Sequence, residues 1–132
     1  MKIASAIRTA GRLALVVALA LSSASVAETK KPKPVDLGKG VTSPEPGVVC
    51  DKKAGFCADF MGISMAYTEM YLGKKAQDKM MAMVKENPGM DMASFTLYNG
   101  VECKTAQKSC YKPKGSTTVD KKTTQALFPP GK

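Results

Sequence analysis

The 132-residue chain contains no histidine and no tryptophan. Ser-His-Asp triads, Cys-His dyads and histidine-ligated zinc sites all need an imidazole, so these classes of active site are excluded. At this length the chain has room for one small domain. The missing histidine favours binding over catalysis, and we expect no enzymatic activity and no cofactor.

Arginine is absent from the chain after residue 27. Residues 28–132 carry 17 lysines and 11 acidic residues, which gives a net charge of +6. Nucleic-acid readers use arginine forks, which bind phosphate and guanine edges bidentately, whereas lysine offers only a point charge. We therefore expect no nucleic-acid partner. The lysines are interpreted as a solvated surface, with weak attraction to anionic envelope surfaces or an acidic partner as the alternative.

The first 27 residues have the pattern of a secretory signal peptide. Lys2, Arg8 and Arg12 precede an apolar run over residues 13–21, and small residues stand at positions 25 and 27. The run is about half of the ~20 residues that a membrane-spanning helix needs, so we expect cleavage after Ala27. The sequence thus predicts a periplasmic or secreted protein without an integral membrane anchor.

Composition divides the remaining chain into three segments. Residues 28–46 hold four of the eight prolines and no aromatic residue, which predicts a flexible Lys/Pro-rich linker. Residues 47–112 contain all four cysteines and are predicted to form the folded module. Residues 113–132 are predicted to be a Lys/Thr-rich tail, in which residues 124–128 form one short helical turn that docks on the module.

An internal repeat is the most informative feature of the module. Two copies of the pattern G-V-x-C-x6-C begin at residues 47 and 100, and each predicts a hairpin with its two cysteines opposite one another. Pairing within each copy closes a short loop worth about 2.5 kcal/mol, whereas pairing between copies closes longer loops worth about 4 kcal/mol. Hairpin geometry nevertheless favours local pairing, and the crossed pairing stays open as the alternative. The predicted disulfides are Cys50 to Cys57 and Cys103 to Cys110.

Two other roles for these cysteines are less well supported. Zinc sites typically use C-x2-C spacing, and exported thiols are normally oxidised. A redox dithiol needs C-x-x-C at a helix N-terminus to depress the thiol pKa. Neither pattern is present, so a structural role is expected.

The second hairpin also has a predicted register. Asn-Gly at residues 99–100, between strand-like runs, is a strong hairpin signal. A two-residue turn would set Leu97 against Glu102. A three-residue loop with Gly100 left-handed instead sets Phe95 against Cys103 and places four apolar groups on one face, so we predict the second register.

A turn at residues 59–62 and a helix are predicted between the hairpins. Thr68 is the expected N-cap of one helix over residues 69–85, in which Gly73 costs about 1 kcal/mol and marks a site for a kink. The predicted fold class is a small disulfide-stapled α+β module, with two cystine hairpins around one central helix. Its core is marginal without the disulfides.

Methionine is unusually frequent, with eight of the nine between residues 61 and 92. The chain has two M-x-M pairs, Met81 with Met83 and Met90 with Met92, and thioethers are soft ligands that suit Cu(I) or Ag(I). Methionine is also an adaptable core filler, and Met83 falls on the apolar stripe of the predicted helix. We expect no metal, and keep a soft-metal-binding envelope protein as the alternative function.

Asp51 and Asp59 flank the first cystine and resemble the carboxylate pair of a glycosidase. Acidic residues are commonplace in turns, however, and a module of roughly 65 residues has little room for a substrate cleft. The preferred function is a small exported binding protein without catalysis that contacts a periplasmic protein or another envelope component. Its candidate contact residues are Tyr67, Tyr71, Lys74 and Tyr111.

Several motifs carry a resemblance to a known family. They are G-V-V-C-D-K at residues 47–52, F-C-A-D at 56–59, G-I-S at 62–64, T-E-x-Y-L-G-K-K-A at 68–76 and N-G-V-x-C at 99–103. In this order they resemble the Fels prophage protein-like family of small exported enterobacterial proteins. That resemblance implies an exported bacterial protein and, because the family has no assigned activity, transfers no catalytic residue. The methionine cluster and the Lys/Pro-rich linker depart from the family pattern.

Overall fold

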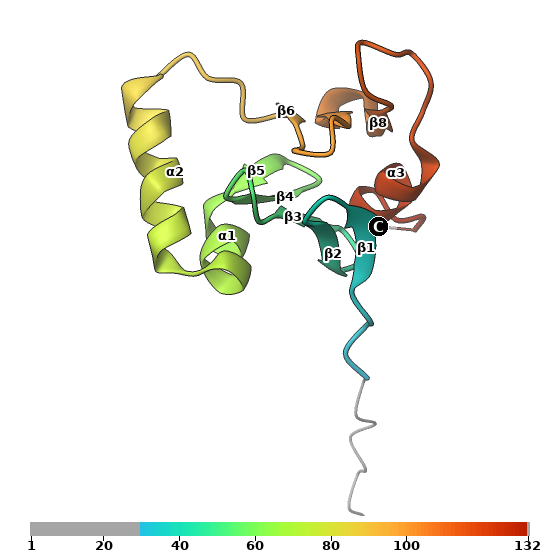
Figure 1. Ribbon diagram of the computed structural model, residues 1–132, viewed down its shortest axis with the longest axis horizontal. Helices are drawn as coiled ribbons and strands as arrows, with labels where there is room; N and C mark the ends of the chain where they lie inside the picture. The colour runs from blue at the N-terminus through green and yellow to red at the C-terminus, as the bar shows by residue number, and fades with distance from the viewer. Residues whose placement is uncertain (1–29, 132) are drawn as a thin grey trace, which may run out of the picture.

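The computed structural model describes residues 30–131. The predicted signal peptide lies outside these residues. Two antiparallel sheets and three α-helices make up the fold, with α1 and α2 at one side of the first sheet and α3 near β1 (Figure 1). The first sheet has the order β1 (Val35–Gly38), β2 (Val41–Glu45), β3 (Val48–Asp51), β4 (Phe56–Asp59), β5 (Gly62–Ser64). The second has the order β6 (Ser94–Thr96), β7 (Glu102–Lys104), β8 (Ser109–Tyr111). The helices are α1 (Met65–Leu72), α2 (Lys74–Glu86) and α3 (Lys121–Leu127), and η1 (Thr105–Gln107) is a 3-10 turn.

Both predicted disulfides are confirmed. Cys50 lies opposite Cys57 in the β3–β4 hairpin, and Cys103 lies opposite Cys110 in the β7–β8 hairpin. In each pair the Cα atoms are 4.0 Å apart. The disulfides therefore close hairpins that strand pairing already brings together, and the α+β fold class is confirmed.

The predicted register of the second hairpin is also confirmed. Phe95 pairs with Cys103, and the Leu97 amide donates to the Val101 carbonyl at 2.8 Å. Gly100 has a φ of +90°, which is the left-handed conformation that the three-residue loop requires. The register buries Phe95, Leu97 and Val101 in the larger of two clusters of buried hydrophobic residues, which we call the main core.

The structure corrects the predicted linker. Residues 35–45 form β1 and β2, and Val41 and Ser43 are buried. The Ser43 hydroxyl donates to the Val48 carbonyl at 2.7 Å, so the buried polar group is satisfied. Local composition indicated a spacer because it contains too few apolar residues, whereas pairing with β3 supplies burial from outside the segment.

The predicted single helix is two helices. Gly73 separates α1 from α2 with a φ of +94°, so the chain breaks at the position predicted for a kink. The N-cap is Ser64, whose hydroxyl accepts from the Tyr67 amide at 3.2 Å, and Thr68 lies inside α1. Ser64 caps the helix four residues earlier than predicted because β5 leads directly into α1.

The structure extends the predicted module at its C-terminal side. Helix α3 starts at Lys121 after the N-cap Asp120, earlier than the expected turn at residues 124–128. Leu127 is fully buried in the main core, and Val119 forms a bridge with Tyr111. Regular structure therefore runs from residue 35 to residue 127, beyond both predicted boundaries of 47 and 112.

The sequence repeat corresponds to a repeated structural unit. In each copy, the amide of the second cysteine donates to a threonine hydroxyl in the next helix. Cys57 donates to Thr68 and Cys110 donates to Thr124, both at 2.9 Å. Each threonine stands four residues after the N-cap of its helix. Each cystine hairpin is thus fixed to the helix that comes after it by the same bond.

Candidate functional site

A cleft of about 450 Å³ lies between the β2–β3 turn and the C-terminal segment. Its lining comes from residues 45–48, the β4–β5 turn, α1, the end of η1 and residues 127–129. Phe60, Tyr67 and Phe128 give it an aromatic character. We call it the aromatic cleft.

The β4–β5 turn holds Phe60 at the cleft. The Asp59 carboxylate accepts from the Met61 amide at 2.8 Å, which fixes the turn. Gly62 has a φ of +123°, and a Cβ there would lie 2.1 Å from the Met92 carbonyl oxygen, so only glycine fits. The turn leaves 67% of Phe60 exposed although the residue is apolar.

Helix α1 forms a second wall. Tyr67 lines the cleft and stacks on Tyr71, with ring centroids 6.2 Å apart. The Tyr71 hydroxyl donates to the Glu45 carboxylate, which also lines the cleft. This hydrogen bond, with smaller contributions from desolvation and the Glu45 charge, raises the pKa of Tyr71 to about 12. Tyr71 is therefore a neutral donor that positions Glu45.

The C-terminal segment completes the cleft. The Gly47 amide donates to the Ala126 carbonyl at 2.8 Å, which ties α3 to the β2–β3 turn. Phe128 and Pro129 then line the cleft, as does Lys108. The charged side chains at the cleft are thus the carboxylates of Glu45 and Asp59 and the ammonium group of Lys108.

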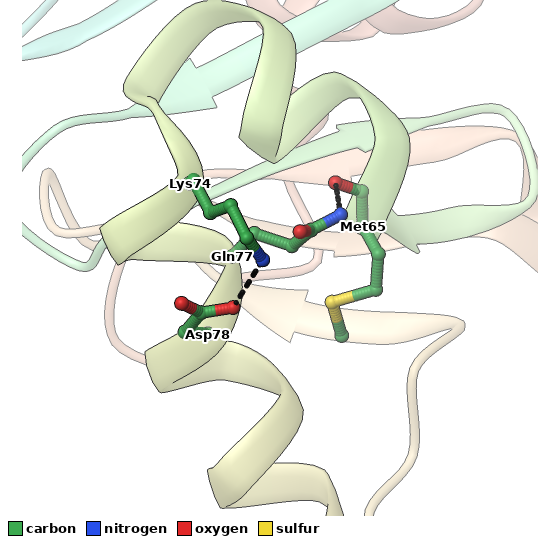
Figure 2. Close-up of polar contacts among 4 residues, drawn as sticks. All are labelled: Met65, Lys74, Gln77 and Asp78. Carbon is green, nitrogen blue, oxygen red and sulfur yellow. Dashed lines mark hydrogen bonds and ion pairs between the residues drawn. The ribbon is translucent and has the colours of Figure 1, made fainter.

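The four predicted contact residues do not form one site. Tyr67 and Tyr71 stack together on α1. Lys74 is exposed on α2, where it pairs with Asp78 at 2.9 Å, and that partner raises the pKa of Lys74 (Figure 2). Tyr111 lies in the second sheet. Only the two tyrosines of α1 therefore belong to the aromatic cleft or its support.

Tyr111 has a separate set of contacts. Its hydroxyl donates to the Gln107 side chain, and the Lys104 ammonium lies 5.8 Å from the ring centroid. These residues line a different hollow with Ser116. Tyr111 therefore contacts residues of its own β7–β8 hairpin.

Asp51 and Asp59 do not form a carboxylate pair. Asp51 is fully buried and accepts from the amides of Lys53, Ala54 and Tyr98. Asp59 lies at the other end of β4 and lines the aromatic cleft. Glu45 is the second acid at that cleft, and sequence reasoning missed it because the composition of residues 28–46 predicts a linker.

The methionines of the two M-x-M pairs are also divided. Met83 and Met90 line one open hollow at the end of α2, whereas Met81 and Met92 do not line it. Within residues 30–131, no group of three or more His, Cys, Asp or Glu side chains is arranged to hold a metal ion. The hollow thus brings together two thioethers rather than four.

Fold and site define a small α+β protein built on two cystine hairpins, with an aromatic cleft between its N-terminal and C-terminal segments. Residues 41–128 match the family described as YcgJ protein. A relative from Escherichia coli K12, described as "Uncharacterized protein YcgJ", is 35% identical over 96 residues, which cover 67% of this chain and 74% of the relative. The chain belongs to the YcgJ family, which confirms the resemblance carried by the motifs. No solved structure matches the chain.

The matched region agrees with the extended fold. It includes β2 and α3, both of which lie outside the module predicted from composition. The two disulfides are typical of proteins from an oxidising compartment. Among residues 30–131, no helix has the length and apolar character needed to span a membrane.

Proposed function

We propose that this chain is an exported binding protein without catalysis, whose aromatic cleft receives an apolar segment of another envelope protein. The observation that carries the proposal is the cleft of about 450 Å³ with an exposed phenylalanine at its edge. Aromatic side chains beside a concave apolar surface are typical of residues that dominate binding energy at protein interfaces.

The rigidity of the cleft supports this function. Asp59 and Gly62 fix the turn that carries Phe60, and the bond from Tyr71 to Glu45 joins α1 to β2. Binding to a surface that is already ordered avoids much of the entropy cost of fixing side chains and loops. A short apolar segment would therefore bind to a cleft whose turn and side chains are already ordered.

The charges at the cleft add a constraint on the partner. Glu45 and Asp59 favour a basic group on the bound segment, while Lys108 favours an acidic group near the end of η1. Complementary charges at an interface contribute mainly to specificity and association rate. We propose that the partner segment is apolar and carries charged groups complementary to these side chains.

Two further observations support export and the absence of catalysis. Both disulfides fit an oxidising compartment, in agreement with the predicted signal peptide. The chain lacks histidine, and the Glu45 carboxylate is engaged by the Tyr71 hydroxyl. These features favour a binding surface over acid–base chemistry at the cleft.

A photo-crosslinking experiment tests the proposal. The photoreactive residue p-benzoylphenylalanine is placed at position 60 or at position 70 of the exported protein, because Phe60 and Met70 are equally exposed, at 67% and 66%. We expect one discrete adduct from position 60 and none from position 70. The adduct at position 60 should disappear when Tyr67→Ala is added and both disulfides are shown to persist. Equal labelling from the two positions, or no adduct from either, contradicts the proposal.

Soft-metal binding is a second candidate function, favoured by one observation. Met83 and Met90 line the same hollow, so two thioethers face a common space at the end of α2. Thioether ligands select Cu(I). Competition for Cu(I) against a chromogenic chelator therefore distinguishes this function from segment binding at the aromatic cleft.

A further inference from the structure

Half of the methionines in residues 30–131 are exposed. Methionine is ordinarily among the residues found most often in protein interiors. Core packing accounts for the buried Met80 but not for this exposed group. Its members are Met61, Met70, Met81 and Met83, with exposed fractions of 72%, 66%, 54% and 44%.

The four exposed methionines occupy separate places on the fold. Met61 is in the β4–β5 turn, Met70 is on α1, and Met81 and Met83 follow Met80 on α2. Methionine is a good helix former, so α1 and α2 accommodate it on their surfaces. Each of the four side chains is individually exposed to solvent. The reactivity of each thioether therefore does not depend on contact with the other three.

Tryptophan, histidine and accessible cysteine sulfur, which are also readily oxidised, are missing or covered. The chain has no tryptophan and no histidine. Its four cysteines form two disulfides and are at most 2% exposed. The accessible sulfur of residues 30–131 is therefore the thioether sulfur of methionine.

We infer that these four methionines are sites of reversible oxidation to the sulfoxide, at which the folded chain consumes two-electron oxidants such as hypochlorous acid. An S–O bond forms and the O–Cl bond is broken. The sulfur is oxidised by two electrons, chloride leaves with the electron pair, and one proton is released. Two thiols of a reductase reverse the step, because they are oxidised to a disulfide while the oxygen leaves as water.

The placement of these residues allows the fold to survive the reaction. A sulfoxide is polar, and it disrupts a protein core when the methionine is buried. Met80 is 3% exposed and belongs to the main core, which Met65 and Met90 also contact. The four exposed side chains are not part of the main core. Their oxidation should therefore leave the core and both cystine hairpins intact.

Titration of the exported protein with hypochlorous acid tests the inference. Peptide mass spectrometry follows each methionine, while circular dichroism and urea unfolding follow the fold. We expect oxygen to be added at the four exposed positions first, with Met80 reacting at least about tenfold more slowly. The urea midpoint should stay unchanged until four oxygens are bound, and methionine sulfoxide reductases with a thiol reductant should restore the original mass.

Leucine variants provide the control, because Leu and Met have similar volumes. The variant M61L/M70L/M81L/M83L should lose its urea transition within the first four equivalents of oxidant, which the native chain absorbs while folded. If that variant does not fold, M70L alone should take up one oxygen fewer than the native chain. Oxidation of Met80 as fast as Met70, unfolding before four oxygens are bound, or failure of the reductases to restore the mass would overturn the inference.

Discussion

Asp51 is one of the residues that link the first sheet to the second hairpin. Its carboxylate lies at the end of β3, where it fixes the β3–β4 turn through the Lys53 and Ala54 amides and also accepts from the Tyr98 amide of the second hairpin. The Lys53 ammonium then lies 4.6 Å from the centre of the Tyr98 ring. A buried acid that is satisfied by three backbone donors has a structural role, which explains why the predicted carboxylate pair does not exist.

Replacing Asp51 should therefore destabilise the fold. We expect Asp51→Ala to lower the free energy of unfolding by about 3 kcal/mol, because hydrogen bonds to a buried charge are lost and their donors remain. Asp36→Ala is the control, since Asp36 is exposed and, within residues 30–131, its carboxylate accepts a hydrogen bond only from the Gly38 amide, at 2.8 Å. Urea unfolding measures both variants, and an equal effect of the two would contradict the structural role of Asp51.

The bond between Tyr71 and Glu45 predicts a pH dependence. The folded protein has a Tyr71 pKa of about 12, above the ordinary value of 10.0. Because the raised pKa reflects stabilisation of the neutral phenol, its contribution to stability is fully present below pH 10 and is lost as the pH rises through 12. In an ultraviolet titration, Glu45→Gln should move one tyrosine transition down towards the ordinary value. An unchanged titration would show that this bond does not set the pKa.

The elements show which parts of the fold depend on local sequence. The cystine hairpins and the register at Gly100 were predictable because Cys spacing and Asn-Gly act within about ten residues. The strands β1 and β2 were missed because their burial depends on β3. At the cleft, Tyr67 was among the predicted contacts, but Glu45 and Phe128 come from segments whose composition predicts a linker and a tail, and no local pattern places them together.

The break between α1 and α2 depends on Gly73. Its φ of +94° is unfavourable for an L-amino acid, although a Cβ at this position would meet nothing within 4 Å. We expect Gly73→Ala to destabilise the protein by about 1 kcal/mol through backbone strain alone. Gly89→Ala is a matched control, since Gly89 also has open space but does not have a positive φ. Urea midpoints compare the two, and a neutral Gly73→Ala would mean that the helices can join.

At the scale of the whole molecule, the fold has two halves that contact one another. The first half contains the first sheet, α1 and α2, and the second half contains the second sheet and α3. Asp51 of the first half holds the Tyr98 turn of the second, and Ala126 of the second half accepts from Gly47 of the first. Helix α3 also contacts β1, β2 and β3 of the first sheet. The aromatic cleft is a product of these contacts, because its walls come from both halves.

Copper binding separates the two candidate functions for the whole protein. If the aromatic cleft carries the function, an anaerobic Cu(I) titration should leave a chromogenic chelator fully loaded at micromolar protein. Removal of copper from the chelator, with loss of that competition in Met83→Leu/Met90→Leu, would establish the soft-metal function instead. Met81→Leu is the control, because Met81 does not line the hollow.

The bond between Gly47 and Ala126 has a consequence for the order in which the protein matures. Helix α3 leaves the ribosome after β1 to β5, because it lies C-terminal to them in the chain. Until α3 arrives, the first sheet lacks its covering helix and the cleft lacks the wall formed by residues 127–129. The aromatic cleft is therefore complete only after residues 127–129 have packed, and the segment binding that we propose has to follow that step.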